Sequence, residues 1–183
     1  YLNEWLFHKI SKSAGIIALR YDFLIVNING KRYPIYAIEE NFDKRLIENN
    51  NKREGPIFKL FENSSKSKVD SISFYQDSKL SKVEVSRKLK RRAIRLINSF
   101  KNGEVSADKV FDVKLMGYSY ALADLFGNGH SISKLNIRFY LNPITGLVEP
   151  IAYDNQSIVD ISKTGLIGEQ YIHGVKSIEI NKE

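Results

Sequence analysis

The sequence predicts an α+β domain in which helices alternate with antiparallel hairpins. Two segments provide most of the evidence: Arg20 to Glu39 holds two apolar runs separated by Asn29-Gly30, and Leu135 to Asp154 holds two more separated by Asn-Pro-Ile-Thr-Gly. The third observation is helical periodicity, which is clearest from Lys82 to Lys101. Helices and hairpins in this order predict a sheet divided into two pieces.

Composition limits the class of protein and the kinds of site it can carry. The chain has 183 residues, of which 43% are hydrophobic, and this suits one folded domain over residues 1–183. Because Tyr1 runs directly into an apolar pattern, we expect this domain to be part of a longer chain. There is no cysteine, so thiolate catalysis and Cys-type zinc sites are excluded. No apolar run approaches the ~18–20 residues of a transmembrane helix.

The first third of the chain contains a helix, a hairpin and a short strand. Asn29-Gly30 favours a type I′ turn, because both residues tolerate a positive φ. The expected elements are a helix over 2–14 that ends at Gly15, strands over 20–28 and 31–39, a short helix plus loop within 41–54, and a strand over 55–61 that carries Lys59.

The remainder is predicted to hold two helices and the second hairpin. Residues 62–81 are polar except for an apolar patch at Ile72–Tyr75, and we expect them to form a connector. The expected elements after it are an amphipathic helix over 82–101, a helix over 111–126 that ends at Gly127, the hairpin over 135–154 and a last strand over 175–180.

The net charge of +7 permits several anionic partners and does not choose among them. The helix over 82–101 is rich in arginine and lysine and could contact a phosphate backbone. A charge-rich helix face is more often simply solvated, and no nucleic-acid-binding motif accompanies this one. Nucleic acid is therefore not the expected partner.

The hairpin over 135–154 brings a potential pair of metal ligands together. If residues 143–147 form the loop, Asn142 faces Val148, and the same register places Asn136 opposite Asp154. An amide oxygen and a carboxylate at that spacing can share one hard divalent cation. The alternative is that both residues merely cap a surface hairpin.

Other polar residues each have a structural and a functional interpretation. Lys59, between Phe58 and Leu60, is either an edge-strand charge or a cation directed at an anion. Glu39 and Glu40 at a strand end are usually solvated. His130, in a loop of small polar residues, is a candidate catalytic residue or ligand, with a surface role as the alternative.

The sequence does not support four common kinds of site. Gly127-Asn128-Gly129 follows a helix and lacks the third glycine of a dinucleotide-binding motif. His8 and His173 have no partner at metal-ligand spacing, so the sequence does not predict a zinc site. Neither a P-loop nor a GxSxG motif is present.

From residue 2 to about residue 155 these segments resemble the spore-coat CotH kinase family. Each piece is short, and the order and spacing of the pieces carry the resemblance. They are Trp5-Leu6 in the first helix; the strand from Asp22 to Gly30; Tyr36 to Asp43 with its two glutamates; Gly55 to Lys59; the helix from Phe111 to Asn128; Asn136; and Glu149 to Asp154.

The resemblance implies a reduced, atypical protein-kinase-like fold that transfers the γ-phosphoryl group of ATP to protein Ser/Thr. By implication Lys59 contacts the nucleotide phosphates, with Glu40 or Glu39 as its orienting partner. Asn136 and Asp154 would then hold Mg²⁺ or Mn²⁺. The implied partner is a protein substrate or a surface protein, at a bacterial cell or spore surface or in the cytoplasm.

One position departs from the kinase pattern. Kinase-type loops place an aspartate five residues before the metal-binding asparagine, and here that position is Ser131. Either His130 accepts the proton of the substrate hydroxyl, or Asp124 approaches from the end of its helix, or the domain is a pseudokinase. The alternative to an enzyme is thus a non-catalytic nucleotide- or surface-binding domain on the same fold.

Overall fold

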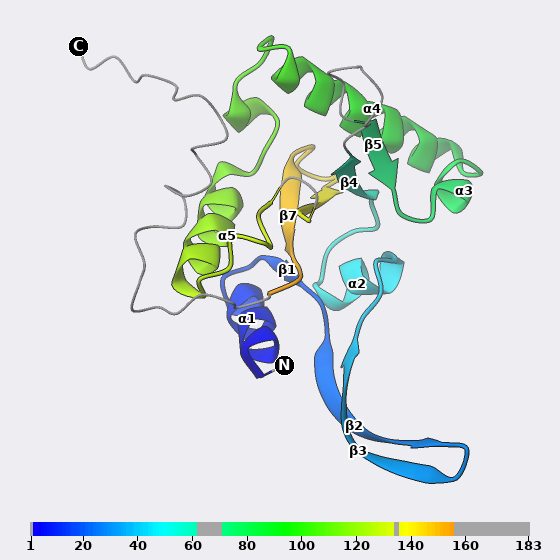
Figure 1. Ribbon diagram of the computed structural model, residues 1–183. Helices are drawn as coiled ribbons and strands as arrows, with labels where there is room; N and C mark the ends of the chain where they lie inside the picture. Colours follow the sequence, from blue (N-terminus) through cyan, green and yellow to red (C-terminus); the bar gives the residue numbers. More distant parts are fainter. Residues whose placement is uncertain (1, 62–70, 134–135, 156–183) are drawn as a thin grey trace.

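The computed structural model describes residues 2–61, 71–133 and 136–155, and its elements are arranged as in Figure 1. The strand expected over 175–180 and His173 lie outside these residues. In chain order the elements are α1 (Leu2–Ser13), β1 (Ile17–Ala18), β2 (Tyr21–Ile28), β3 (Lys31–Glu39), α2 (Lys44–Asn49), β4 (Ile57–Phe61), β5 (Ser71–Phe74), α3 (Asp77–Leu80), α4 (Glu84–Lys101), a 3₁₀ turn (Ala107–Lys109), α5 (Val113–Leu125), β6 (Arg138–Leu141) and β7 (Val148–Ala152).

The strands form two sheets, as the sequence predicts. The larger sheet has five strands in the order β1-β7-β6-β4-β5, and the smaller one consists of β2 and β3. Neighbours in the larger sheet are antiparallel except β1 and β7, which run parallel with Ile17 beside Ile151. The α+β class with antiparallel hairpins is therefore confirmed, with one parallel pair that the sequence did not predict.

The β2–β3 hairpin extends away from the body of the molecule (Figure 1). Its turn has the expected conformation, with φ of 51° at Asn29 and 79° at Gly30. At the other end Tyr21 pairs with Glu39, and this end lies against α1. The hairpin thus delivers Glu39 and Glu40 to the body of the domain.

The core occupies both faces of the five-stranded sheet. Along β4, Ile57 belongs to a cluster on one face, whereas Phe58 and Leu60 belong to a cluster on the other, as the two-residue period of a strand requires. The first cluster is completed mainly by α2, through Leu46 and Ile47. The second is completed mainly by α4, through Ala93, Ile97, Leu89 and Leu96.

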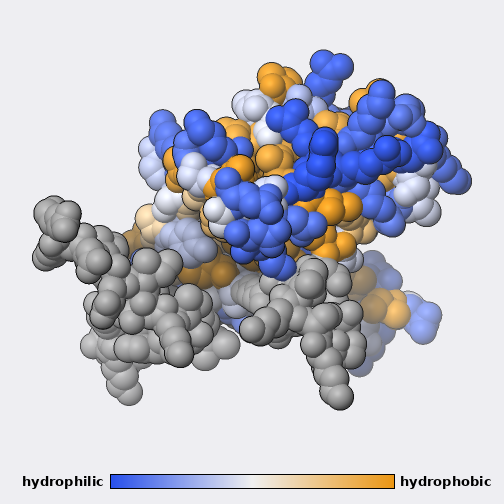
Figure 2. All heavy atoms as spheres, turned by 90° about the horizontal axis from the view of Figure 1, so that it is seen from above, coloured by the Kyte–Doolittle hydropathy of each residue, from blue (hydrophilic) through white to orange (hydrophobic). Residues whose placement is uncertain are grey.

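Helix α4 lies over the larger sheet (Figure 1). Its apolar face packs into the core, and most of its basic residues are exposed. Seen from the side of this helix, the surface is largely hydrophilic, with hydrophobic side chains visible between the charged ones (Figure 2). Arg87 pairs with Glu84 and Lys90 pairs with Asp77, so part of this charge is neutralised locally. The described helices include none that is long and apolar enough to cross a membrane.

Two short strands were missed by sequence reasoning. β1 has only two residues, which are fully buried, and its pairing with β7 cannot be read from local periodicity. β5 falls within the polar segment expected to be a connector, where Ile72 and Phe74 alternate with serines. Four alternating residues are a weak signal for a strand, and the strand conformation depends on pairing with β4.

Candidate functional site

The two residues expected to share a cation lie in contact. The amide Nδ2 of Asn136 donates a hydrogen bond of 2.5 Å to Oδ2 of Asp154. Asn136 lies just before β6, where its backbone N–H donates to the carbonyl of Ser133. Asp154 follows β7 with φ of 54°, a left-handed conformation that aspartate tolerates better than most residues. A half-turn of the amide would present the oxygen of Asn136 beside the carboxylate of Asp154.

The register that led to this pair is shifted by one residue. Leu141, not Asn142, pairs with Val148, because Asn142 instead closes the turn by donating its N–H to the carbonyl of Leu147. Continuing the ladder from Arg138 and Ile151 by two residues would place Asn136 opposite Tyr153. The contact with Asp154 forms because both residues lie beyond the regular ladder.

His130 joins this pair from the loop after α5. Its Nε2 lies 3.3 Å from Oδ2 of Asp154, and half of its side chain is exposed. The loop is fixed by Asn128, whose Nδ2 donates to the backbone carbonyl of Asp154. Asp124 lies in the last turn of α5, ahead of this loop. His130, one of the two residues considered as the proton acceptor, is thus in contact with the proposed metal ligand.

Ser131 has a structural contact instead. It is buried, its hydroxyl donates to the carbonyl of Asn128 at 3.0 Å, and its N–H donates to Oδ1 of the same residue. A hydroxyl that donates to a carbonyl inside a loop holds the loop closed. It offers no carboxylate to a substrate.

Two cationic residues continue the site along the sheet. Arg138 donates from Nη1 to the carbonyl of Asn136 at 2.6 Å, and its guanidinium lies over the rings of Tyr153 and Phe42 at 4.8 and 5.8 Å. Lys59 is the β4 neighbour of Arg138 in the ladder, on the face that also carries Ile57. Two positive charges are therefore adjacent on one sheet face, beside Asn136.

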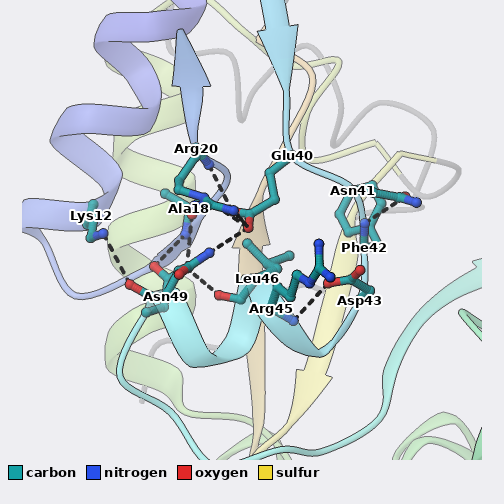
Figure 3. A network of polar contacts seen from close by, with 11 residues as sticks. Lys12, Ala18, Arg20, Glu40, Asn41, Phe42, Asp43, Arg45, Leu46 and Asn49 are labelled. Carbon is teal, nitrogen blue, oxygen red and sulfur yellow. Dashed lines mark hydrogen bonds and ion pairs between the residues drawn. The ribbon is translucent and has the colours of Figure 1, made fainter.

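The two glutamates take different positions at the end of β3. The carboxylate of Glu40 accepts hydrogen bonds from Nε and Nη2 of Arg20 at 3.0 and 2.8 Å, and from Nδ2 of Asn49 at 2.6 Å (Figure 3). These contacts tie β3 to β2 and α2. Within the described parts of the chain, neither Glu40 nor Glu39 forms an ion pair with Lys59. A pairing of Lys59 with either glutamate remains a prediction.

A cavity of about 440 Å³ adjoins this face. It lies between α2, β4, α3 and the start of α4, and Phe42 and Tyr75, whose ring centroids are 4.6 Å apart, form part of its wall. Because Arg138 lies over the ring of Phe42, which lines the cavity, the cavity is next to the cationic residues. Its volume and mixed lining suit a planar organic group.

A buried ion pair holds the hairpin that carries the site. Nζ of Lys52 lies 2.6 Å from Oε2 of Glu149, a side chain that is only 2% exposed. The other carboxylate oxygen of Glu149 accepts from Nδ2 of Asn142 at 2.7 Å, and Oδ1 of Asn142 accepts from the N–H of Ile144. Lys52, β7 and the turn are thereby connected in one network.

Sequence reasoning missed several contributors. No sequence signal marked Arg138, because its position depends on rings from two other segments, Phe42 after β3 and Tyr153 after β7. Glu4 and His8 are one helical turn apart, a spacing visible in the sequence, but their third neighbour is Glu39 from another element. Asn155 donates its N–H to Glu4, a contact between residues far apart in the sequence.

The family is decided by comparison with known families. The family model described as CotH kinase protein matches residues 1–175. The chain belongs to this family. The resemblance carried by the short segments is thus confirmed. A search of the curated proteins found no match.

Proposed function

We propose that this CotH domain binds ATP with Mg²⁺ or Mn²⁺ and transfers the γ-phosphoryl group to a serine or threonine of a protein. The observation that supports this most directly is the contact between Asn136 and Asp154, an amide and a carboxylate brought together from the two ends of a hairpin. Both are oxygen ligands of the kind that hard divalent cations prefer. The carboxylate of Asp154 is partly exposed, so an ion can reach it.

The cationic residues and the cavity next to this pair would bind the nucleotide. Lys59 and Arg138 are suited to neutralise phosphate oxygens from the sheet face, and the cavity beyond Phe42 has room for a nucleobase. The bound divalent ion would offset the charge that builds up on the phosphate oxygens during transfer. Positioning and charge neutralisation of this kind account for most of the catalysis in phosphoryl transfer.

In the proposed transfer step, His130 is the base that accepts the proton of the acceptor hydroxyl. The hydroxyl oxygen of the acceptor forms a bond to the γ-phosphorus, the bond between that phosphorus and the β,γ-bridging oxygen breaks, and ADP leaves. His130 accepts the hydroxyl proton on a ring nitrogen. Asp154, 3.3 Å from Nε2, stabilises the resulting imidazolium. The acceptor, by the same proposal, is a side chain of a separate protein.

A second candidate function follows from Ser131. Kinase loops place a carboxylate at this position, and serine has none. The hydroxyl of Ser131 instead donates a hydrogen bond to the carbonyl of Asn128. The alternative is a pseudokinase, which binds nucleotide or a surface protein without transfer.

Thermal unfolding with increasing ATP, with and without Mg²⁺ or Mn²⁺, tests nucleotide binding in both versions. We expect metal-dependent stabilisation by ATP that Asp154→Asn abolishes and that Lys59→Ala weakens at least ~10-fold. Lys88→Ala, which removes an exposed lysine of α4, is the matched control and should leave the response unchanged. A parent protein that does not respond to ATP under any condition would refute the proposal.

Transfer of labelled γ-phosphate to a general protein acceptor then separates the enzyme from the pseudokinase. Metal-dependent labelling that falls by about 10²-fold or more in His130→Ala supports transfer with His130 as the base. Binding of ATP without any labelling supports the pseudokinase.

A further inference from the structure

His8 is buried without a hydrogen-bond partner. Its side chain is only 3% exposed, and within the described residues neither Nδ1 nor Nε2 forms a hydrogen bond. The ring stacks on Tyr21, with centroids 5.7 Å apart. A buried polar group left without a partner costs about 1–3 kcal/mol and is rare in native proteins. The position therefore calls for a ligand that can satisfy a ring nitrogen.

Two carboxylates converge on this histidine. Glu4 lies one turn earlier on α1, on the same helix face, and Glu39 comes from the end of β3. Nε2 of His8 is 3.6 Å from Oε1 of Glu39, too long for a hydrogen bond, and one ligand atom from each of the three residues lies within 4.8 Å of the other two. Burial, and then the charge of Glu39, raise the pKa of Glu4. Two carboxylates therefore lie close to an imidazole that has no hydrogen-bond partner within the described residues.

We propose that Glu4, His8 and Glu39 bind one divalent transition-metal ion, with Zn²⁺ as the representative ion. One imidazole and two carboxylates form a donor set that such ions accept, with a fourth position open to solvent beside the partly exposed Glu39. Bond lengths of about 2.0–2.2 Å in a tetrahedral site place ligand atoms roughly 3.3–3.6 Å apart. The pair formed by His8 and Glu39 already has this separation, and the remaining approach of about an ångström is within reach of glutamate rotamers.

The imidazole distinguishes this ion from the one proposed at Asn136 and Asp154. Magnesium and calcium prefer all-oxygen sites, whereas imidazole favours zinc and its neighbours in the first transition row. The new site would join three parts of the fold, namely α1, the base of the β2–β3 hairpin and the segment after β7. The last of these is connected because Oε1 of Glu4 accepts the N–H of Asn155, the residue after Asp154.

The test is calorimetric titration of the metal-free chain with Zn²⁺ in the absence of nucleotide. We expect one site with a dissociation constant at or below about 1 μM, and an increase in the unfolding temperature on binding. Glu39→Gln is the main variant, because this partly exposed side chain tolerates replacement, and it should weaken binding by at least ~30-fold. Glu4→Gln should do the same. Co²⁺ in place of Zn²⁺ should give the visible absorption of a tetrahedral site, and Glu39→Gln should abolish it.

Two matched controls decide where any bound zinc lies. Glu48→Gln removes a glutamate of α2 that is paired with Lys44 at the surface, and it should leave the affinity unchanged. Among the described residues, His130 is the other histidine that faces a carboxylate, and zinc affinity should again persist in His130→Gln. Loss of binding in His130→Gln with retention in Glu39→Gln would overturn the assignment, as would weak binding that no variant alters.

The titration contains no nucleotide, so this proposal does not depend on phosphoryl transfer. If the chain binds zinc through Glu39 but does not bind ATP, the metal-site proposal stands and the kinase proposal fails. The converse result would retain the kinase function alone.

Discussion

Replacing Lys52 by methionine should strongly destabilise the domain, because it leaves the carboxylate of Glu149 buried without its cation. At the observed separation of 2.6 Å and an effective dielectric constant of about 20, the Coulomb attraction is about 6 kcal/mol before the cost of desolvation. Protonating an ordinary glutamate at pH 7 costs about 3.7 kcal/mol, and this sets a ceiling on the loss. Removing one partner of a buried pair typically costs about 3–5 kcal/mol. We therefore expect the free energy of unfolding to fall by about 3–3.7 kcal/mol.

Urea unfolding followed by far-UV circular dichroism at pH 7 measures this loss directly. Lys44→Met is the matched control, because Lys44 forms a solvent-exposed pair with Glu48 at 3.7 Å, and it should cost less than about 0.5 kcal/mol. The double variant Lys52→Met with Glu149→Met should recover much of the loss, since a buried pair can often be replaced by apolar residues. A loss below about 1 kcal/mol in Lys52→Met would show that water reaches Glu149 and would refute the reasoning.

Three further predictions concern single contacts. Gly55→Ala should lower the free energy of unfolding by about 2–3 kcal/mol in urea titrations, because the added Cβ would lie 2.4 Å from the backbone carbonyl oxygen of Leu141; an unchanged midpoint would contradict this packing. Tyr140→Phe should cost about 1–2 kcal/mol at pH 7 by removing the hydrogen bond to the carbonyl of Arg53. Burial, and then the charge of Glu149, raise the pKa of Tyr140, so the folded state favours the neutral phenol. Its contribution is therefore complete below about pH 10 and is lost as the pH rises further, and Tyr140→Phe should flatten alkaline unfolding curves in that range. Ser131→Asp should fail to create a kinase-type base and should lower the unfolding free energy by roughly 2–4 kcal/mol, since a carboxylate cannot donate to the carbonyl of Asn128; a stable variant with increased phosphoryl transfer would count against this.

The elements that the sequence predicts well are those whose signals are local. Asn29-Gly30 determines its turn through positive φ at two adjacent residues, and the apolar face of α4 repeats over five turns of helix. β1 and β5 escape prediction because two or four residues carry almost no periodicity. Their strand conformation depends on partners far along the chain, Ile151 for β1 and Phe58 for β5.

The sequence predicted the contact between Asn136 and Asp154, but it did so from a strand register that is wrong. Asn136 and Asp154 do meet, but the ladder that was used to pair them is shifted by one residue. The prediction tolerated this error because a hairpin of this length brings its two ends together in either register. Loop residues such as Asn128 and buried partners such as Arg138 could not be assigned, since their contacts depend on tertiary packing.

The polar groups of the site lie where regular structure ends, and this explains both its accessibility and its dependence on backbone geometry. Asn136 precedes β6 and His130 lies in a loop, so neither is confined to a ladder position. Asp154 follows β7 in the left-handed conformation, which β-branched residues adopt only at considerable cost. Asp154→Val should therefore remove the carboxylate and strain the backbone that supports Asn128, whereas Asp154→Asn keeps the conformation and isolates the chemistry. Comparing the unfolding free energies of these two variants separates the structural role of this position from its role as a ligand.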